Sequence, residues 1–220
     1  MRSDQAIAQL RASWSFPRGA GFTGSGAAAP EFTGDIQELL TAAGVRAGRP
    51  VLVYVCAKEE PRDSGGHTFE QSHFADERVA LAAKAFNLLK LRDGSAVAKA
   101  PALAGTVAPR IVVIDSSGKR VGSIEGDPSA SGLYALMKRT ALSMGARPLD
   151  QFVRDYRRLL DEVDTVDAAR DSLERRRDEL AANPTPALRR RVAELAERIR
   201  STSERLVRKE RELLGLPEKS

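Results

Sequence analysis

The chain has 220 residues, of which 42% are hydrophobic and only 5% aromatic, and its net charge is +5 at pH 7. This length allows one domain with an appendage, or two small domains. The single cysteine excludes an intrachain disulfide and any multi-cysteine metal site, and two histidines add few ligands, so we expect no metal and no cofactor.

The sequence shows no sign of a membrane span, because no stretch approaches the roughly 18 apolar residues that such a helix needs. The N-terminal stretch MRSDQAIAQLRASW lacks the apolar centre of a secretory signal, so we expect a cytoplasmic protein, although a chain trimmed of its signal would look the same. The 35 basic and 30 acidic residues are mostly interleaved, which argues against a nucleic-acid surface.

The first part of the chain changes from irregular to ordered near residue 35. Residues 1–34 are rich in Gly, Ala, Ser and Pro, and we expect them to form a flexible N-terminal segment. Asp35 can cap a short helix, with Glu38 as its capping-box partner and Gly44 as a stop signal. Residues 51–55, VLVYV, are apolar and β-branched, which is typical of a strand buried on both faces.

The elements that follow predict a mixed sheet. Residues 74–86 have the spacing of a helix with a cap at Asp76, and residues 87–93 predict a second strand. Residues 107–126 predict a β-hairpin with a Ser-Ser-Gly-Lys turn, and residues 129–145 predict a further helix. A parallel strand pair followed by an antiparallel hairpin indicates an α/β domain with helices on both faces of the sheet.

Residues 148–220 have a different pattern. Stripe positions, mostly apolar, recur in alternating steps of four and three from Phe152 to Leu180, and again from Leu188 to Leu213. The Asn-Pro-Thr-Pro sequence between the two series is a strong turn signal. We therefore expect helices at about 149–182 and 186–214 that form an antiparallel coiled-coil helical hairpin.

Polar side chains interrupt the stripes of this hairpin, which weakens a dry two-helix core: Arg170, Arg177, Thr202 and Lys209. The stripes are therefore expected to pack on something further. Two packing partners are possible: the rest of the same chain, or the hairpin of a second copy in a four-helix bundle. In the second case the protein is a homodimer.

Three segments carry a resemblance to a known family: VLVYVCA, HFADERVALAAKAFNLLKL and VAPRIVVIDSSGKRVGSIEG. On these segments the chain resembles bacterial domains of the thioredoxin-like fold family, over about half of its length. The resemblance implies a thioredoxin-like mixed sheet with flanking helices in a domain spanning 35–147. It also places Pro109 at the position where the family has a cis-proline.

The resemblance locates the family's Cys-x-x-Cys motif on four residues that contain no sulfur: Asp63, Ser64, Gly65 and Gly66. Disulfide exchange needs one thiolate to attack and a second thiol to resolve the mixed disulfide. The loop therefore has the position of an active site without its reagents. We expect a degenerate, redox-inactive site, which argues against an enzyme.

Two further expectations concern residues near this loop. Cys56 lies in the central strand, where a thiol is usually packed in the core and inert. The alternative function is that of a single-cysteine thiol oxidoreductase or peroxidase that uses Cys56. In the family, the residue before the proline presents its backbone to an extended peptide. The resemblance thus implies a peptide groove at Ala108 and Pro109.

Two arginine triplets flank the predicted hairpin tip: Arg175, Arg176, Arg177, Arg189, Arg190 and Arg191. They would form a positive patch for phosphate groups or for an acidic partner. Alternatively, they would pair with the carboxylates around them: Asp171, Glu174, Asp178, Glu179 and Glu194. No aromatic residue lies among them, which argues against binding of single-stranded nucleic acid.

The function that these features predict is that of a redox-inactive thioredoxin-like protein. It would act as a protein-interaction or assembly module, with dimerisation or partner binding through the C-terminal helical hairpin.

Overall fold

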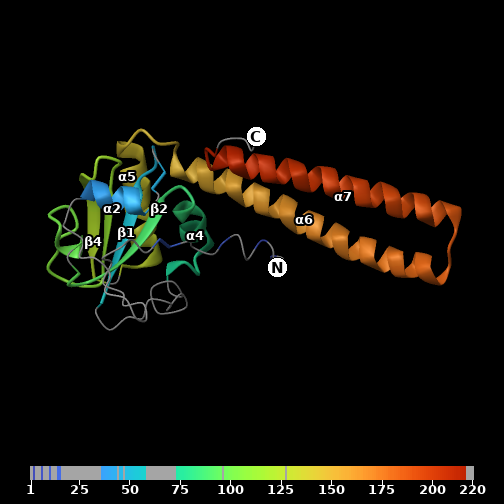
Figure 1. The fold of residues 1–220 in the computed structure, drawn as a ribbon, viewed down its shortest axis with the longest axis horizontal. Helices are drawn as coiled ribbons and strands as arrows, with labels where there is room; N and C mark the ends of the chain where they lie inside the picture. Colours follow the sequence, from blue (N-terminus) through green and yellow to red (C-terminus); the bar gives the residue numbers. More distant parts are fainter. Residues whose placement is uncertain are drawn as a thin grey trace. The chain divides into compact units, whose positions relative to one another are not determined.

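The chain folds into two compact units, shown in Figure 1. We call Arg11–Val153 the sheet unit, and Met1–Leu10 together with Arg154–Ser220 the helical unit. The computed structural model describes residues 2, 6, 10, 14, 15, 36–43, 45, 46, 48–57, 73–95, 97–126 and 128–216. All structural statements below concern these residues.

A four-stranded mixed sheet forms the centre of the sheet unit, in the order β2-β1-β3-β4. Strand β1 runs parallel to β2 and antiparallel to β3, and β3 and β4 are antiparallel. The strands are β1 (Val51–Cys56), β2 (Asn87–Arg92), β3 (Arg110–Ile114) and β4 (Arg120–Glu125). The sheet confirms the predicted parallel pair followed by a hairpin.

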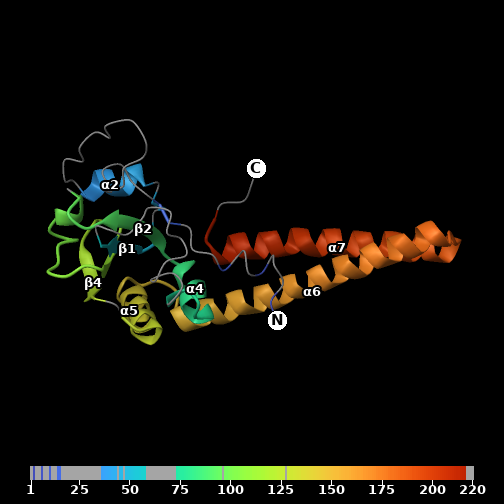
Figure 2. The same ribbon diagram turned by 90° about the horizontal axis from the view of Figure 1, so that it is seen from below.

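Helices cover both faces of this sheet. Figure 2 shows α2 on one face and α4 and α5 on the other. The bounds are α2 (Ile36–Ala42), α4 (Glu77–Ala83) and α5 (Ala130–Ser143), with a 3₁₀ turn η1 (Val97–Lys99) after β2. The predicted cap at Asp76 is confirmed, because its carboxylate accepts hydrogen bonds from the backbone N–H groups of Arg78 and Val79 at 2.8 and 3.4 Å.

The core of the sheet unit is built around β1, in which all six residues are buried. Val51, Val53 and Val55 belong to the same apolar cluster as Leu39 and Leu40 of α2. Because side chains alternate along a strand, the other three residues of β1 face the opposite side of the sheet. Burial on both faces explains why this strand is apolar throughout rather than alternating.

Part of the N-terminal segment pairs with the sheet. Ser15 lies beside β2 in a parallel bridge and exchanges two backbone hydrogen bonds with that strand, at 2.9 and 3.1 Å. The ring of Trp14 packs against the rings of Tyr54 and Phe74, with centroids 6.0 and 5.8 Å apart. The composition of residues 1–34, which predicts a flexible segment, gives no sign of this pairing. Most of that segment lies outside the described residues.

Two long helices, α6 (Leu149–Ala182) and α7 (Pro186–Leu213), follow the sheet, and their bounds confirm the predicted helices to within a residue. Thr185 caps α7 by accepting the backbone N–H of Leu188 at 3.2 Å. Lys209 pairs with Glu162 at 2.6 Å, whereas Arg170 of α6 donates to Ser203 at 3.2 Å. The residue number rises along α6 as it falls along α7, so the two helices run antiparallel.

A close approach between α2 and the turn of the β3–β4 hairpin generates a test of the fold. Gly118 has φ +79°, and a Cβ there would lie 2.3 Å from Cγ2 of Ile36. We expect Gly118→Ala to lower the free energy of unfolding by about 2 to 3 kcal/mol, from backbone strain and the clash together. Urea unfolding followed by circular dichroism measures this change.

The matched control for that variant is Gly48→Ala. Gly48 has φ +76°, but a Cβ there meets no atom within 4 Å. We therefore expect Gly48→Ala to lower the free energy of unfolding by about 1 kcal/mol, from backbone strain alone. Equal losses for the two variants would show that contact with Ile36 contributes nothing.

Candidate functional site

The end of the sheet at which β1 finishes brings several site residues together. The strand register pairs Val55 with Arg110 and Cys56 with Arg92. Consequently Cys56, Pro109 and the residue after β2, Asp93, lie at one edge, and the N–H of Asp93 donates to the carbonyl of Cys56 at 2.8 Å. In open α/β sheets this edge, at the carboxyl ends of the parallel strands, is where ligands usually bind.

The degenerate loop predicted to contribute to this edge lies outside the described residues: Asp63, Ser64, Gly65 and Gly66. The described chain stops at Ala57 and resumes at His73. His73 is buried, and its Nε2 lies against the carbonyl of Pro128, which can only accept. Within the described ranges, no three His, Cys, Asp or Glu side chains gather closely enough to hold a metal ion.

Cys56 is completely buried at the end of β1. A substrate or reagent in solvent has no direct access to a thiol with zero exposed surface. Reaction at this sulfur therefore requires the end of the strand to open.

A buried arginine organises the loop that leads into β3. The side chain of Arg110 is 4% exposed, and its Nη1 pairs with the carboxylate of Asp93 at 2.8 Å. Its other donors reach backbone carbonyls of the preceding segment, at 3.0 Å for Leu103 and 3.1 Å for Ala98. Since a buried charge is tolerated only when it is paired and hydrogen-bonded, these partners fix the position of the whole segment 98–109.

A second contact holds the same loop from β4. The carboxylate of Glu125 accepts from the hydroxyl of Thr106 at 2.7 Å and from its backbone N–H at 3.3 Å. The hydroxyl first, and then the N–H, hold the pKa of Glu125 below its ordinary value. A Cβ on Gly105 would lie 2.6 Å from Cδ of Arg110, so only glycine fits between Arg110 and Glu125.

The residues predicted to form a peptide groove follow directly. The peptide bond between Ala108 and Pro109 is cis. The carbonyl of Pro109 accepts the N–H of Gly126 at 2.8 Å, whereas the N–H and C=O of Ala108 make no hydrogen bond within the described part of the chain. Val107 is 49% exposed beside them. The loop thus offers one free backbone donor and acceptor next to an exposed apolar side chain.

In the helical unit, the six predicted patch residues are all on the surface. Arg175, Arg177, Arg189, Arg190 and Arg191 are exposed and Arg176 is half-buried. Among the described residues, none of the six makes an ion pair or a side-chain hydrogen bond. The expected local pairing with Asp171, Glu174, Asp178, Glu179 and Glu194 is therefore not formed.

The polar contacts between α6 and α7 lie farther from the connection of the two helices than the arginine triplets do. Glu162 pairs with Lys209 at 2.6 Å and with Arg205 at 3.3 Å. The hydroxyl of Tyr156, which is completely buried, donates to the carboxylate of Glu210. Burial, and then this hydrogen bond, raise the pKa of Tyr156 well above its ordinary value. Two polar stripe positions, Arg170 and Lys209, are thus used in cross-helix contacts.

The sequence did not predict that Arg110 holds the loop before β3 or that Tyr156 joins α6 to α7. Tyr156 was expected on the stripe, but its hydroxyl partner lies 54 residues away. An arginine at the first position of an otherwise apolar strand, as in Pro-Arg-Ile-Val-Val-Ile, is a weak signal for a buried charge in need of partners.

Comparison with known proteins adds no relative to this description, because no protein-family model and no curated protein matches the chain. In the described part of the chain, none of the helices combines the length and the apolar character needed to cross a membrane.

The buried guanidinium of Arg110 gives a direct test of the loop. We expect Arg110→Met to lower the free energy of unfolding by about 3 kcal/mol, because Asp93 and the buried carbonyls lose their donor. Chemical denaturation measures the loss. The control is Arg120→Met, since Arg120 also donates to this loop, to the carbonyl of Ala104 at 2.8 Å, but at the surface. A loss no larger than that of the control, about 1 kcal/mol, would contradict the role of Arg110.

Proposed function

We propose that the chain is a redox-inactive protein with a thioredoxin-like sheet unit, and that it acts as a protein-interaction or assembly module. Partner binding or dimerisation takes place through the helical unit, which we propose to be a coiled-coil hairpin.

The order of the elements supports the thioredoxin-like assignment. The resemblance implies a central parallel pair next to an antiparallel hairpin, with helices on both faces. The sheet order β2-β1-β3-β4 has this arrangement. Ser15, in parallel pairing with β2, adds a further segment at the outer edge of that strand.

The spacing of the buried residues on α6 supports the coiled-coil assignment. In the helical unit they include positions separated by alternating steps of three and four: Tyr156, Leu159, Val163 and Val166. Leu173 continues the series one heptad after Val166. This periodicity is that of a helix that packs lengthwise against another helix.

The burial of Cys56 carries the proposal that the protein has no redox activity. The chain contains no other cysteine, so no second thiol of the same chain can resolve a mixed disulfide. The one thiol has no exposed surface. The alternative function, a single-cysteine thiol oxidoreductase or peroxidase, needs a sulfur that substrates reach.

An assay of disulfide reduction and peroxide consumption tests this proposal. We expect the purified protein to show no turnover above the rate of the free reagents, and Cys56→Ala to behave identically. A chromogenic thiol reagent should react with Cys56 only as fast as the native protein opens, and rapidly once the protein is unfolded in urea. Turnover that disappears in Cys56→Ala would overturn the proposal in favour of the enzyme.

The loop before β3 supports a second interaction site, a groove for an extended peptide. Strand-like recognition uses backbone donors and acceptors together with contacts between apolar side chains. The free N–H and C=O of Ala108 and the exposed side chain of Val107 provide both kinds of contact. The Arg110 and Glu125 contacts hold this loop in place, which lowers the entropy cost of binding.

Binding to an array of extended decapeptides tests the groove. We expect Val107→Glu to weaken the binding of selected peptides about tenfold, because a charge would replace the apolar contact, without loss of stability. The control is Leu142→Glu, at another exposed apolar side chain of the sheet unit (68% exposed). Equal binding by both variants and the unchanged protein would exclude a groove at this loop.

A further inference from the structure

We propose that the distal halves of α6 and α7, residues 171–182 and 186–200, form an interface with the same surface of a second copy of this chain. We call these residues the distal surface. The inference rests on the proposed assembly function and specifies its partner and its location.

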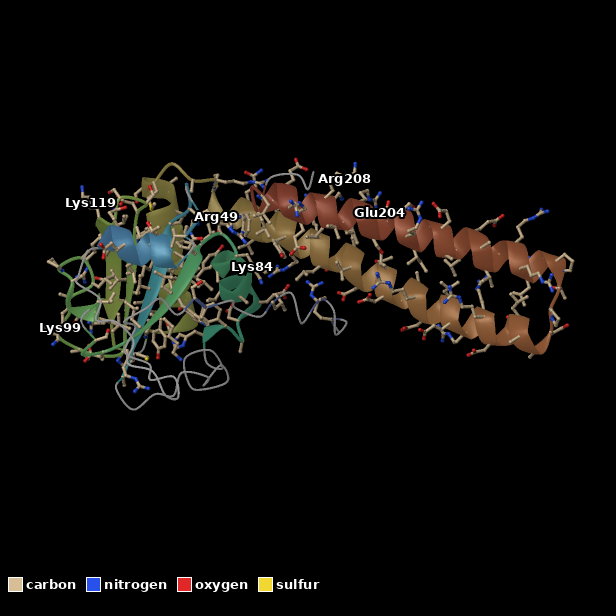
Figure 3. All side chains as sticks on the ribbon, viewed as in Figure 1. Arg49, Lys84, Lys99, Lys119, Glu204 and Arg208 are labelled. Atoms are coloured by element: carbon tan, nitrogen blue, oxygen red, sulfur yellow. The ribbon has the colours of Figure 1, made fainter. Side chains whose placement is uncertain are left out.

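The distal surface differs from the rest of the helical unit in how its helices are held together. The hydrogen bonds and ion pairs that join α6 to α7 involve residues 156, 162 and 170 of α6 and residues 203, 205, 209 and 210 of α7. Among the described residues, no such contact joins 171–182 to 186–200. Figure 3 shows side chains projecting along both helices, including this half.

Charges of both signs on the distal surface lack partners. Besides the six arginines, five carboxylates make no ion pair or hydrogen bond among the described residues: Asp171, Glu174, Asp178, Glu179 and Glu194. Helical periodicity places Glu174 and Asp178 four residues apart, on one side of α6. A two-fold interface brings the same patch of both copies together, so arginines of one copy meet carboxylates of the other.

The net charges of the two helices favour one arrangement of the copies. Helix α6 carries ten acidic and seven basic side chains, whereas α7 carries nine basic and five acidic ones. Opposite potentials attract across an interface, and like charges placed face to face are costly. The arrangement that satisfies both conditions sets α6 of one copy against α7 of the other, in a four-helix bundle.

Apolar side chains of the distal surface are incompletely covered. Leu173 is buried, but the other apolar stripe residues of the distal surface are only half-buried: Leu180, Leu188, Val192, Leu195 and Ile199. A second hairpin packed on this half would bury them further, which contributes about 25 cal/mol for each Å² of apolar surface removed from water.

The mixture of charges also distinguishes a second copy from a polyanion. A nucleic acid or another polyphosphate would meet the five carboxylates as well as the six arginines, and the repulsion would oppose binding. A surface that carries both signs is complementary to itself. We therefore commit to a second copy as the occupant.

Sedimentation velocity over a range of protein concentrations, at low and high salt, tests the interface with the full chain. A basic-to-acidic variant and an acidic-to-basic variant are needed. The first is Arg189→Glu, Arg190→Glu and Arg191→Glu together, on α7. The second is Asp171→Arg, Glu174→Arg and Asp178→Arg together.

We expect the unchanged chain to dimerise, with a dissociation constant that rises with salt. Each triple variant alone should dimerise at least about tenfold more weakly, because like charges then face each other. An equimolar mixture of the two variants should restore association as a heterodimer. Circular dichroism of each variant verifies that the helices stay folded.

A matched control changes the net charge equally but outside the distal surface. It combines Arg139→Glu, Arg154→Glu and Arg208→Glu, at three exposed arginines. We expect this variant to dimerise as the unchanged chain does.

Three results would overturn the inference. They are a monomer at every concentration, a dimer that neither triple variant weakens, and a monomer that binds heparin through the arginine triplets. The first and third leave the proposed interaction function standing with another partner, and the second leaves dimerisation with another interface. Failure of the redox-inactive proposal would show separately, as turnover that depends on Cys56.

Discussion

Strand β1 is hydrogen-bonded along both edges and buried on both faces, and the rest of the sheet unit is arranged around it. A strand in this position cannot carry a polar reactive group without a partner, because every side chain faces packed atoms. Any side chain of this unit that is to meet a ligand in solvent therefore has to lie outside β1. Cys56 is the last residue of this strand and is completely buried.

Short-range patterns were enough to predict most of the fold. The apolar run VLVYV predicted the central strand, the hairpin turn was predicted at Ser-Ser-Gly-Lys, and Asp76 was predicted as a helix cap. The two long helices were predicted to within a residue at each end, because the four-three stripes and the Asn-Pro-Thr-Pro turn are contained in the local sequence. Each of these signals lies in the same segment of the sequence as the element that it predicts.

The candidate site was harder to predict, since its contacts join distant parts of the chain. Arg110 is held by Asp93 and by the backbone carbonyls of residues 98 and 103. Because every residue has a backbone carbonyl, the residue types at these two positions give no sign of the contact. The pairing of Ser15 with β2 is also long-range, since more than 70 residues separate the two segments in the sequence. For the arginine triplets, the sequence left two readings open, and only the distances show that neighbouring carboxylates do not pair with them.

The repeat of the α6 stripe has a consequence for how the protein can vary in length. Because the buried positions recur every seven residues, removing one heptad from each helix at matched levels would leave the contacts near both ends in register. Such a deletion would bring the connecting turn about 10 Å closer to the base of the pair. The length of the two helices can therefore change in steps of seven residues while the contacts near both ends of the helical unit stay the same.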